Sequence, residues 1–332
     1  MIQRWINLFL AIGVFFLFNC SDKQKLEGPK KISIAVIPKG TTHEFWKSIH
    51  AGAVKAGREL GVEIIWKGPL KEDDREAQIS VVENFISAGV SGIVLAPLDE
   101  TALVVPVSNA KRAGIPVVVI DSGLKGSDYI SYIATNNKLG GELAGRRLAE
   151  LLNGKGRVIL LRYQEGSAST NLRESGFLEI MQTYPGIEVV SFNQYAGATT
   201  ETAYRVSENL LAPYKTADGR LTIDGIFCPN ESSTFGMLRA LQDANLAGKV
   251  RFIGFDSSVK LVEALEKGEL DGLILQNPFK MGYLGVKTMV AFLQNQPYES
   301  YIDTGVTLVT RENMNQPEIR EIILPDLSQW LD

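Results

Sequence analysis

Short hydrophobic runs alternate with amphipathic stretches along the first half of the chain. Apolar runs bounded by turn residues are typical of strands buried on both faces, and a hydrophobic period of about 3.6 is typical of helices. The predicted strands here are Ile32–Ile37, Val62–Trp66, Gly92–Pro97 and Ile115–Ser122. The predicted helices are Glu44–Leu60, Arg75–Ala88 and Glu100–Ala113, each followed by a glycine. This alternation predicts a parallel sheet with helices on its faces.

The second half of the chain repeats this order. The predicted strands are Val158–Leu161, Ile187–Val190, Gly225–Asn230 and Val250–Ser257. The predicted helices are Leu139–Asn153, Asn171–Thr183, Glu201–Leu211, Ser232–Ala244 and Val259–Lys267. Asn277-Pro278 then interrupts the pattern, and a helix at Met281–Leu293 and a strand at Gly305–Val309 follow. The tail Met314–Asp332 is polar with scattered apolar residues, which predicts a surface extension.

One sequence motif occurs in both halves of the chain. Ile115–Ser122 and Val250–Ser257 are apolar runs that both end in Asp-Ser, 135 positions apart. The repeat predicts an α/β fold of two similar doubly wound lobes with parallel sheets. Ligands bind at the carboxyl ends of the strands in such sheets, so Asp121 and Asp256 are positioned to meet a ligand. The competing interpretation is that each Asp only caps the helix after its strand.

The N-terminus has the pattern of an export signal. Arg4 is the one charged residue among the first 20, and Ile6–Phe18 is almost entirely apolar. This stretch is too short for a comfortable membrane-spanning helix. We therefore expect residues 1–19 to be a signal peptide and residues 20–30 to be a polar tether.

Cys20 directly follows this apolar stretch. It resembles the lipidated cysteine of bacterial lipoproteins, although Phe18 and Asn19 stand where small residues are usual. The alternative is a plain signal peptide in which the cysteine is incidental.

Composition excludes several kinds of function. The net charge is −4 and no basic block occurs, so we expect no nucleic-acid partner. Two histidines and the spare cysteine Cys228 do not make a transition-metal site, and we expect neither metal nor cofactor. The motifs of phosphate-binding loops and serine-nucleophile elbows are missing from the sequence. Asp121 and Asp256 could form a general acid and base pair, but nothing else supports catalysis, so we expect no enzyme.

Several short motifs occur in a characteristic order along the chain. They are Thr42–Trp46, Ala134–Asn137 with Gly140-Gly141, Asn230-Glu231, Gly254–Asp256 and Gln276. Together they resemble the periplasmic sugar-binding proteins of ABC importers, specifically the ribose-binding-protein-like group of the type I periplasmic binding protein family. The resemblance covers about residues 31–310. It implies two α/β lobes that close on a sugar and are joined by a three-segment hinge, near Thr135-Asn136, Gln276-Asn277 and Thr304.

The resemblance also implies how the chain is divided. The N-terminal lobe would comprise residues 31–135 plus 277–303, and the C-terminal lobe residues 136–276 plus 304–332. We expect a monomer in the periplasm or cell envelope, whose partners are the transmembrane subunits of an ABC permease. A lipid anchor at Cys20 would hold it at the membrane.

The resemblance assigns roles at the sugar site. Asp121 and Asp256 would each accept hydrogen bonds from two adjacent hydroxyls. Phe45 and Trp46 would stack on the sugar ring, although an aromatic residue at a helix start also packs against the core. Arg173 would reach the anomeric region, and the alternative is a surface arginine.

Two amide residues complete the expected hydrogen-bonding set. Asn230 and Gln276 each end an apolar run, and an amide can donate to one hydroxyl and accept from another. The alternative is a structural role in a turn or hinge.

His43 and Ser122 depart from the ribose-binding pattern. His43 stands in place of an asparagine and could still donate a hydrogen bond. Ser122 stands in place of an arginine beside the first aspartate, which removes a charge and suits a larger or differently substituted ligand. The second-lobe aromatic residue that faces the ring is not evident, and Tyr195 is the candidate.

The sequence thus predicts a non-enzymatic solute receptor for a monosaccharide, acting by hinge closure. One alternative is a sensory receptor that signals to a chemotaxis or kinase partner. Another is a polyol, nucleoside or autoinducer-type ligand in place of an aldose. A transcription regulator with the same core would need an N-terminal DNA-binding helix pair, and residues 1–31 carry an export signal instead.

Overall fold

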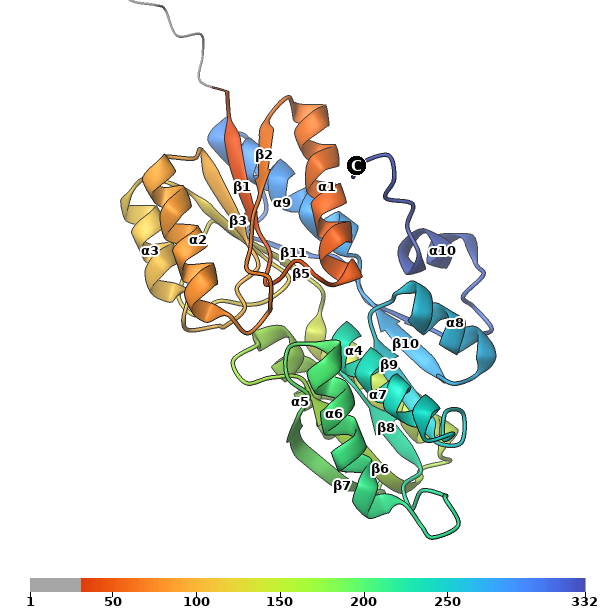
Figure 1. Ribbon diagram of the computed structural model, residues 1–332. Helices are drawn as coiled ribbons and strands as arrows, with labels where there is room; N and C mark the ends of the chain where they lie inside the picture. The colour runs from red at the N-terminus through yellow and green to blue at the C-terminus, as the bar shows by residue number, and fades with distance from the viewer. Residues whose placement is uncertain (1–30, 332) are drawn as a thin grey trace, which may run out of the picture. The chain divides into compact units, whose positions relative to one another are not determined.

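Two six-stranded sheets organise the computed structural model, which describes residues 31–331 (Figure 1). From Ile32 onward the chain clusters as one compact unit. The signal peptide, the lipidation site Cys20 and the tether predicted at the N-terminus lie outside the described residues. Among the residues described, no helix is long and apolar enough to cross a membrane.

The first sheet has the strand order β11-β5-β4-β3-β1-β2, and all of its strand pairs are parallel. Its strands are β1 (Ser33–Ile37), β2 (Glu63–Trp66), β3 (Gly92–Leu95), β4 (Val117–Ile120), β5 (Ser131–Ala134) and β11 (Tyr301–Asp303). Helices α1 (Glu44–Leu60) and α9 (Pro278–Leu293) bury apolar residues on one face. Helices α2 (Arg75–Ala88) and α3 (Val104–Arg112) cover the other. We call this sheet with its four helices the first lobe.

The second sheet has the order β12-β10-β9-β8-β6-β7, and only β12 pairs in the antiparallel direction among its described strands. Its strands are β6 (Lys155–Arg162), β7 (Gly186–Tyr195), β8 (Gly225–Phe227), β9 (Arg251–Phe255), β10 (Gly272–Leu275) and β12 (Thr307–Val309). Helices α4 (Asn137–Leu151) and α5 (Ala168–Gln182) cover one face. Helices α6 (Thr200–Leu211), α7 (Glu231–Asp243), α8 (Val259–Lys267) and α10 (Pro317–Ile323) cover the other, and a short 3₁₀ turn (Ala212–Tyr214) follows α6. We call this assembly the second lobe. The predicted fold of two doubly wound lobes is confirmed.

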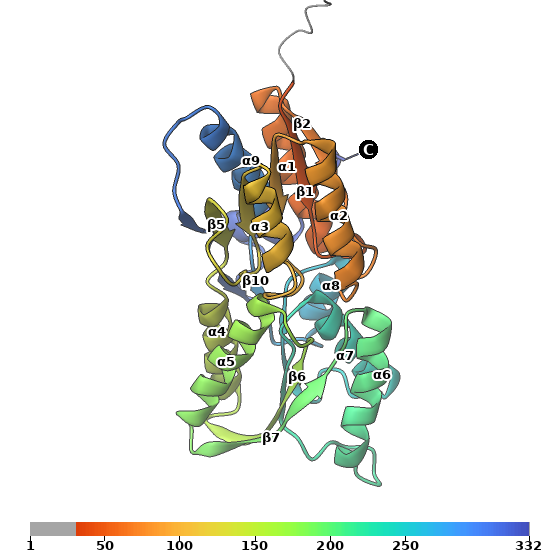
Figure 2. The same cartoon turned by 90° about the vertical axis from the view of Figure 1, so that its left-hand side faces the viewer.

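The chain passes between the lobes at three places, which Figure 2 shows from the side. It leaves the first sheet after β5 to enter α4, returns after β10 to enter α9, and leaves again between β11 and β12. Two of these segments are bonded to each other: the hydroxyl oxygens of Thr135 and Thr304 lie 3.3 Å apart, and Thr135 donates to the carbonyl of Gly305. Two of the three crossings are therefore connected to each other.

Gly52 and Gly176 occupy corresponding places in the two lobes. A Cβ atom at Gly52 in α1 would collide with the carbonyl oxygen of Phe279 in α9. A Cβ atom at Gly176 in α5 would collide with the carbonyl oxygen of Lys138 in α4. Glycine is required at both positions because two helix backbones approach each other closely. This packing fixes α1 and α5, whose N-terminal halves carry candidate site residues.

The C-terminal tail differs from the prediction. It contains helix α10, and Met314, Ile319 and Ile323 are buried in the core of the second lobe. The description of this segment as a surface extension is therefore wrong for its first half. The apolar residues Ile319 and Ile323 are four apart, which places them on one face of the helix.

Helix α3 begins later than predicted, at Val104 rather than Glu100. The Asp99 carboxylate accepts hydrogen bonds from the backbone amides of Thr101 and Ala102, which holds this segment in a turn. The amide of Glu100 donates to Gly166 in the second lobe instead of starting the helix.

Candidate ligand site between the lobes

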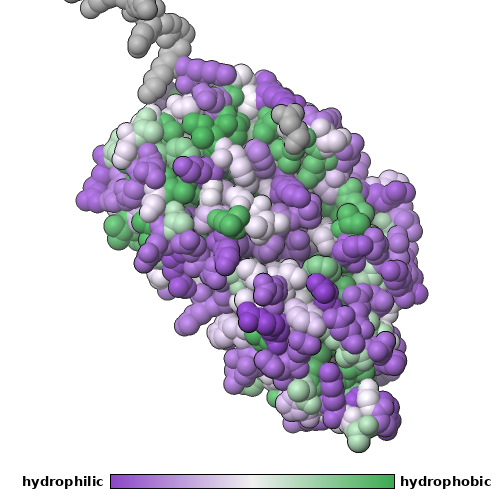
Figure 3. Space-filling view, viewed as in Figure 1, coloured by the Kyte–Doolittle hydropathy of each residue, from purple (hydrophilic) through white to green (hydrophobic). Residues whose placement is uncertain are grey.

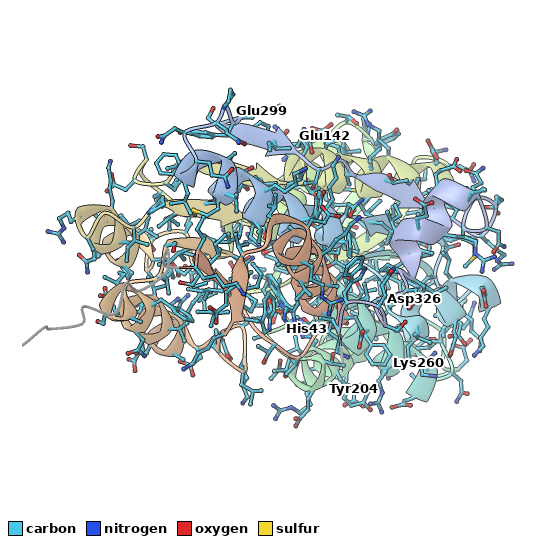
Figure 4. All side chains as sticks on the ribbon, turned by 90° about the horizontal axis from the view of Figure 1, so that it is seen from above. His43, Glu142, Tyr204, Lys260, Glu299 and Asp326 are labelled. Carbon is cyan, nitrogen blue, oxygen red and sulfur yellow. The ribbon has the colours of Figure 1, made fainter. Side chains whose placement is uncertain are left out.

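The carboxyl ends of both sheets meet at a small cavity between the lobes. Figure 4 labels His43 near the middle of its view, among crowded side chains, whereas Glu299 and Tyr204 lie at the edge. The cavity has a volume of about 30 Å³. It is lined by Lys39, His43, Phe45, Trp46, Glu72 and Asp121 of the first lobe and by Tyr163, Ser169, Thr170, Arg173, Asn230, Glu231, Asp256 and Gln276 of the second. Every residue predicted for the site is among them, except Ser122 and the aromatic candidate Tyr195.

Asp121 and Asp256 have the same unusual backbone conformation. Their φ angles are 61° and 65°, in the left-handed region that favours glycine. Each aspartate donates its backbone N–H to the next strand of its sheet, Asp121 to Ile133 in β5 and Asp256 to Ile274 in β10. Backbone strain of this kind concentrates at functional sites, where surrounding structure holds it in place. The two halves of the repeat therefore share this backbone hydrogen bond as well as the Asp-Ser sequence.

Asp121 forms an ion pair with a residue that the sequence analysis overlooked. The ammonium of Lys39 lies 2.9 Å from a carboxylate oxygen of Asp121, and both side chains are about 4% exposed. Lys39 also donates to the hydroxyls of Ser169 and Ser167 of the second lobe. The sequence argument that Ser122 removes a charge beside the first aspartate is therefore incomplete, because Lys39 supplies a cation there.

Asp256 is held by neutral donors. One carboxylate oxygen accepts from the Gln276 amide at 2.7 Å, and the other accepts from the backbone N–H of Glu231 at 3.1 Å. The Arg173 guanidinium is 4.0 Å away. Burial raises the pKa of Asp256, and Arg173 opposes the shift. The amide oxygen of Gln276 is buried without a hydrogen-bond partner, so an acceptor beside Asp256 is available.

Arg173 is buried, so the alternative of a surface arginine is wrong. Its side chain is 3% exposed. It donates from Nε to Asn137 at 2.8 Å and from Nη1 to the carbonyl of Pro229 at 2.9 Å. Its guanidinium lies 3.9 Å from the ring centre of Phe255. Three neighbouring elements therefore fix this cation beside Asp256.

Glu72 connects the polar groups on the first-lobe side. One carboxylate oxygen accepts from His43 Nδ1 at 2.5 Å and from Trp46 Nε1 at 2.7 Å. The other accepts from the hydroxyl of Tyr163 in the second lobe at 2.7 Å. Gln164 donates to the backbone carbonyl of Glu72. Glu72 therefore orients the predicted residues His43 and Trp46 and also joins the lobes.

The His43–Glu72 contact is an ion pair at neutral pH. Burial opposes a charged imidazole, but the Glu72 carboxylate outweighs it and raises the pKa of His43 to about 9. Burial likewise opposes a charged carboxylate, but His43 outweighs it and lowers the pKa of Glu72 to about 2. His43 thus donates a hydrogen bond to Glu72, and it does so as a charged group.

The first turn of α1 is capped from the other lobe. His43 is the N-cap residue of α1 and makes no side-chain cap hydrogen bond. The backbone N–H groups of Glu44 and Phe45 instead donate to the carboxylate of Glu231, at 3.4 and 3.2 Å. Helix N-termini attract anions because their first amides lack partners. Burial nevertheless raises the pKa of Glu231 to about 7.

Phe45 and Trp46 lie together at this end of α1. Their ring centres are 4.9 Å apart with an interplanar angle of 89°, an edge-to-face pair. Both also belong to the core of the first lobe, so packing and site roles coexist.

Asn230 has a structural role, which was the alternative to ligand binding, and it also lines the cavity. Its side-chain oxygen caps α7 by accepting from the backbone N–H of Ser233, and its amide nitrogen donates to Ser232. Gln276 similarly combines a position beside the hinge with its bond to Asp256.

Ser122 and Tyr195 lie elsewhere. The Ser122 hydroxyl is fully buried and accepts from the backbone N–H of Ser169, a bond between the lobes. Tyr195 is 38% exposed and stacks with Arg162, whose guanidinium is 5.0 Å from its ring centre. Tyr163, which is 1% exposed and lines the cavity, is instead the second-lobe aromatic residue of this site.

Lys39 and Tyr163 were within reach of the sequence analysis. Both lie within two residues of the end of a lobe's first strand, β1 or β6, at the carboxyl end where ligands bind. Glu72 gave no comparable signal because it stands in a charged loop, 91 positions before its partner Tyr163. Among the described residues, no cluster of side chains suited to a metal ion is present.

Comparison with known sequences identifies relatives over most of the chain. The ribose import binding protein RbsB of Haemophilus influenzae is 27% identical over 278 residues, which cover 84% of this chain and 91% of the relative. The D-allose-binding periplasmic protein of Escherichia coli is 27% identical over 265 residues, covering 77% and 83%.

Solved structures resemble the whole fold. A carbohydrate transporter solute-binding protein from Agrobacterium radiobacter, in complex with D-arabinose, is 34% identical with a TM-score of 0.84. The alignment covers 90% of this chain and all of that one. A solute-binding protein from Agrobacterium vitis, bound with α-D-tagatopyranose, is 31% identical with a TM-score of 0.81, covering 88% and 99%.

A family model confirms the resemblance found in the sequence motifs. The model of the periplasmic binding protein domain matches residues 34–297. Members of this family bind substrates in transport and are not enzymes, which agrees with the expectation for this chain. The chain belongs to the periplasmic binding protein family.

Proposed function

We propose that this protein is the extracytoplasmic substrate-binding component of a carbohydrate ABC transporter and captures a monosaccharide between its lobes. The observation that carries the proposal is the meeting of Asp121 and Asp256, one from each lobe, at a single cavity. Relatives named as binding proteins for ribose and D-allose, and solved structures holding D-arabinose and α-D-tagatopyranose, support the ligand class.

The charges of the site favour a neutral ligand with many hydroxyl groups. The cavity is lined by three basic residues and four acidic ones, namely Lys39, His43 and Arg173 and Glu72, Asp121, Asp256 and Glu231. These groups already form ion pairs and hydrogen bonds with one another. A ligand with a net charge would disturb this balance at a high desolvation cost, whereas hydroxyls can both donate and accept.

Two kinds of contact would bind the two surfaces of a sugar. The remaining lone pairs of Asp121 and Asp256, with the Gln276 amide oxygen, would accept from hydroxyls. The apolar ring faces would meet Phe45 and Trp46 from the first lobe and Tyr163 from the second.

Capture would proceed by hinge closure. Residues of both lobes line the cavity, so a sugar would enter when the lobes separate and would be enclosed when they close. Bonds from Lys39, Glu72 and Glu231 to the opposite lobe would be broken on opening and remade on closing. Ligand contacts from both lobes would then favour the closed state, which a permease can recognise.

The lobe boundaries and the lipid anchor belong to the same proposal. Strand β11 pairs in the first sheet and β12 in the second, which supports boundaries at residues 31–135 plus 277–303 and 136–276 plus 304–332. The N-terminal pattern ending at Cys20 supports lipid anchoring to a membrane. The proposed functional unit is a monomer. The sensory alternative finds no support among the relatives.

A thermal-shift screen against pentoses, hexoses, polyols and nucleosides tests the proposal. A ligand that binds the folded protein raises the melting temperature by mass action. At least one pentose or hexose, with D-ribose, D-allose, D-arabinose and D-tagatose tried first, should raise it in a concentration-dependent way. Stabilisation by nucleosides alone, or by no member of the panel, would contradict the proposed ligand class.

A further inference from the structure

The last residues of the chain cross from the second lobe to the first. Figure 1 shows the dark blue segment leaving α10 beside α8 and ending at the C mark beside α1. Its beginning is fixed in the second lobe, because Ile319 and Ile323 of α10 are buried in that core. We call residues 324–331 the strap.

The far end of the strap contacts α1 of the first lobe. Arg58 donates to the backbone carbonyl of Gln329 at 2.8 Å and to that of Trp330 at 3.5 Å. The Arg58 guanidinium lies 5.6 Å, and the Lys55 ammonium 5.8 Å, from the ring centre of Trp330. These distances are within the range of cation–π attraction. The backbone N–H groups of Trp330 and Leu331 both donate to the carbonyl of Leu327. These bonds fold the strap into a turn that places the Trp330 indole against Lys55 and Arg58.

The middle of the strap lies over a cavity that borders the ligand site. This cavity of about 140 Å³ is lined by Leu324, Pro325 and Leu327 of the strap and by the first turns of α1 and α8. Phe45, Asp256 and Gln276 line both this cavity and the smaller one between the lobes. The strap therefore covers the flank of the site as well as joining the lobes.

We propose that the strap is a latch that stabilises the closed arrangement of the two lobes and so raises the affinity of the site. Opening the hinge moves α1 away from α8 and α10, and the contacts of Arg58 and Lys55 with Trp330 must then be released. Contacts that form in only one of the two states shift the equilibrium toward that state. If the closed state is less populated, the apparent affinity for the ligand falls in proportion. The affinity part rests on the proposed sugar function, and the effect on lobe separation does not.

The first test measures lobe separation without ligand. Spin labels on cysteines introduced at the exposed residues Glu76 in α2 and Glu201 in α6 report the distance between the lobes. The full-length protein would carry Cys20→Ser, and Cys228 is buried. Deletion of residues 324–332, Trp330→Ala and Arg58→Ala should each increase the population with long distances. Arg146→Ala, which removes an exposed arginine paired with Glu142 in its own helix, should not.

The second test measures sugar affinity of the same variants by calorimetry. The deletion should weaken binding about three- to tenfold, and Trp330→Ala and Arg58→Ala by smaller factors. Melting curves identify any variant that is no longer folded, and the two point variants keep the test available if the deletion is unstable. Unchanged distance distributions in all three variants would overturn the latch. If the parent protein bound no sugar while the strap variants still showed longer distances between the lobes, the proposed ligand class would be overturned and the latch would stand.

Discussion

Asp121 and Asp256 occupy the same place in the two lobes, but their surroundings differ. Both follow a buried strand, have a φ near 60° and donate their N–H to the neighbouring strand. Asp121 is neutralised by a buried lysine, whereas Asp256 is held by an amide and a backbone N–H, with Arg173 at 4.0 Å. The duplicated fold thus sets where a carboxylate stands, and loop residues specific to each lobe set its electrostatic partner.

The largest expected effect follows from this difference in partners. Asp121→Ala leaves Lys39 buried without its counter-ion and should lower the free energy of unfolding by about 3–5 kcal/mol. Asp256→Ala removes hydrogen bonds from neutral donors and the longer-range attraction of Arg173, whose bonds to Asn137 and Pro229 remain, so it should cost less, about 1–3 kcal/mol. Urea denaturation of both variants gives the comparison.

A double variant and a surface control accompany that measurement. Lys39→Met together with Asp121→Leu should recover much of the stability lost in Asp121→Ala, since an apolar pair can replace a buried ion pair. Asp128→Ala, which breaks an exposed pair with Lys111, should change little. An Asp256→Ala protein less stable than Asp121→Ala would contradict the assigned difference.

Above about pH 7, the pH dependence of stability should come mainly from His43 of the first lobe, because the raised pKa of Glu231 in the second lobe, about 7, confines its contribution to lower pH. The pKa of His43 is raised from about 6.5 to about 9 in the folded protein, so the folded state binds its proton more tightly. The stabilisation is complete below pH 6.5 and is lost as the pH rises through 9. The total loss should be about 3 kcal/mol.

Thermal unfolding recorded between pH 6 and pH 10 checks this expectation. The melting temperature of the parent protein should fall across that interval, and His43→Gln should flatten the curve. The lowered pKa of Glu72, about 2, sets the other limit, because its contribution is present above about 4.5 and is lost as the pH falls toward 2. If the melting temperature of His43→Gln fell with pH as steeply as that of the parent, His43 would not be the cause of the pH dependence.

The shared backbone conformation should give equal effects in both lobes. Replacing either aspartate by alanine leaves a side chain in the left-handed region, at a cost of about 1–2 kcal/mol, which glycine avoids. Asp121→Gly should therefore be more stable than Asp121→Ala, and Asp256→Gly more stable than Asp256→Ala, by similar amounts in chemical denaturation. If alanine were the better replacement at either site, the strain argument would fail there.

The smallest effects distinguish the two tyrosines of the second lobe. Tyr195→Ala should change sugar affinity less than about twofold, because Tyr195 packs on Arg162 away from the cavity. Tyr163→Phe removes the bond to Glu72 across the lobes and should weaken binding several-fold. Titration calorimetry with the same sugar settles which tyrosine serves the site.

Local signals in the sequence determined much of the fold. Helices α1, α2 and α8 begin and end where the sequence predicts, and Gly61, Gly89 and Gly268 end them in the left-handed conformation. Strand β11 was missed because three residues, two of them exposed, leave no hydrophobic pattern.

The site was predictable where it depends on the repeat and not where it depends on distant pairs. Asp121 and Asp256 were found because the same Asp-Ser motif ends both apolar runs. Asn230 and Gln276 came from the order of motifs along the chain, and Arg173 came from the family resemblance. Lys39 was missed although it follows β1, at the end of the strand where ligands bind. Glu72 was missed because its role depends on partners such as His43 and Tyr163, which only the folded chain brings near.

The surface gives less guidance than the interior. Figure 3 shows a face on which hydrophilic residues dominate and hydrophobic ones are scattered in small groups. Single apolar residues on a surface are ordinary and carry no assignment by themselves. The polar groups that indicate a function are instead the buried ones between the lobes.

Titration calorimetry of two variants tests the central claim, that one sugar is held by a carboxylate from each lobe. Asp121→Asn and Asp256→Asn keep the side-chain shape and tolerate the left-handed backbone while removing the charge. With the sugar that the thermal screen selects, the parent protein should bind one molecule, and each variant should bind at least about tenfold more weakly while remaining folded. Parental affinity in either variant would show that its carboxylate does not touch the ligand and would contradict the account.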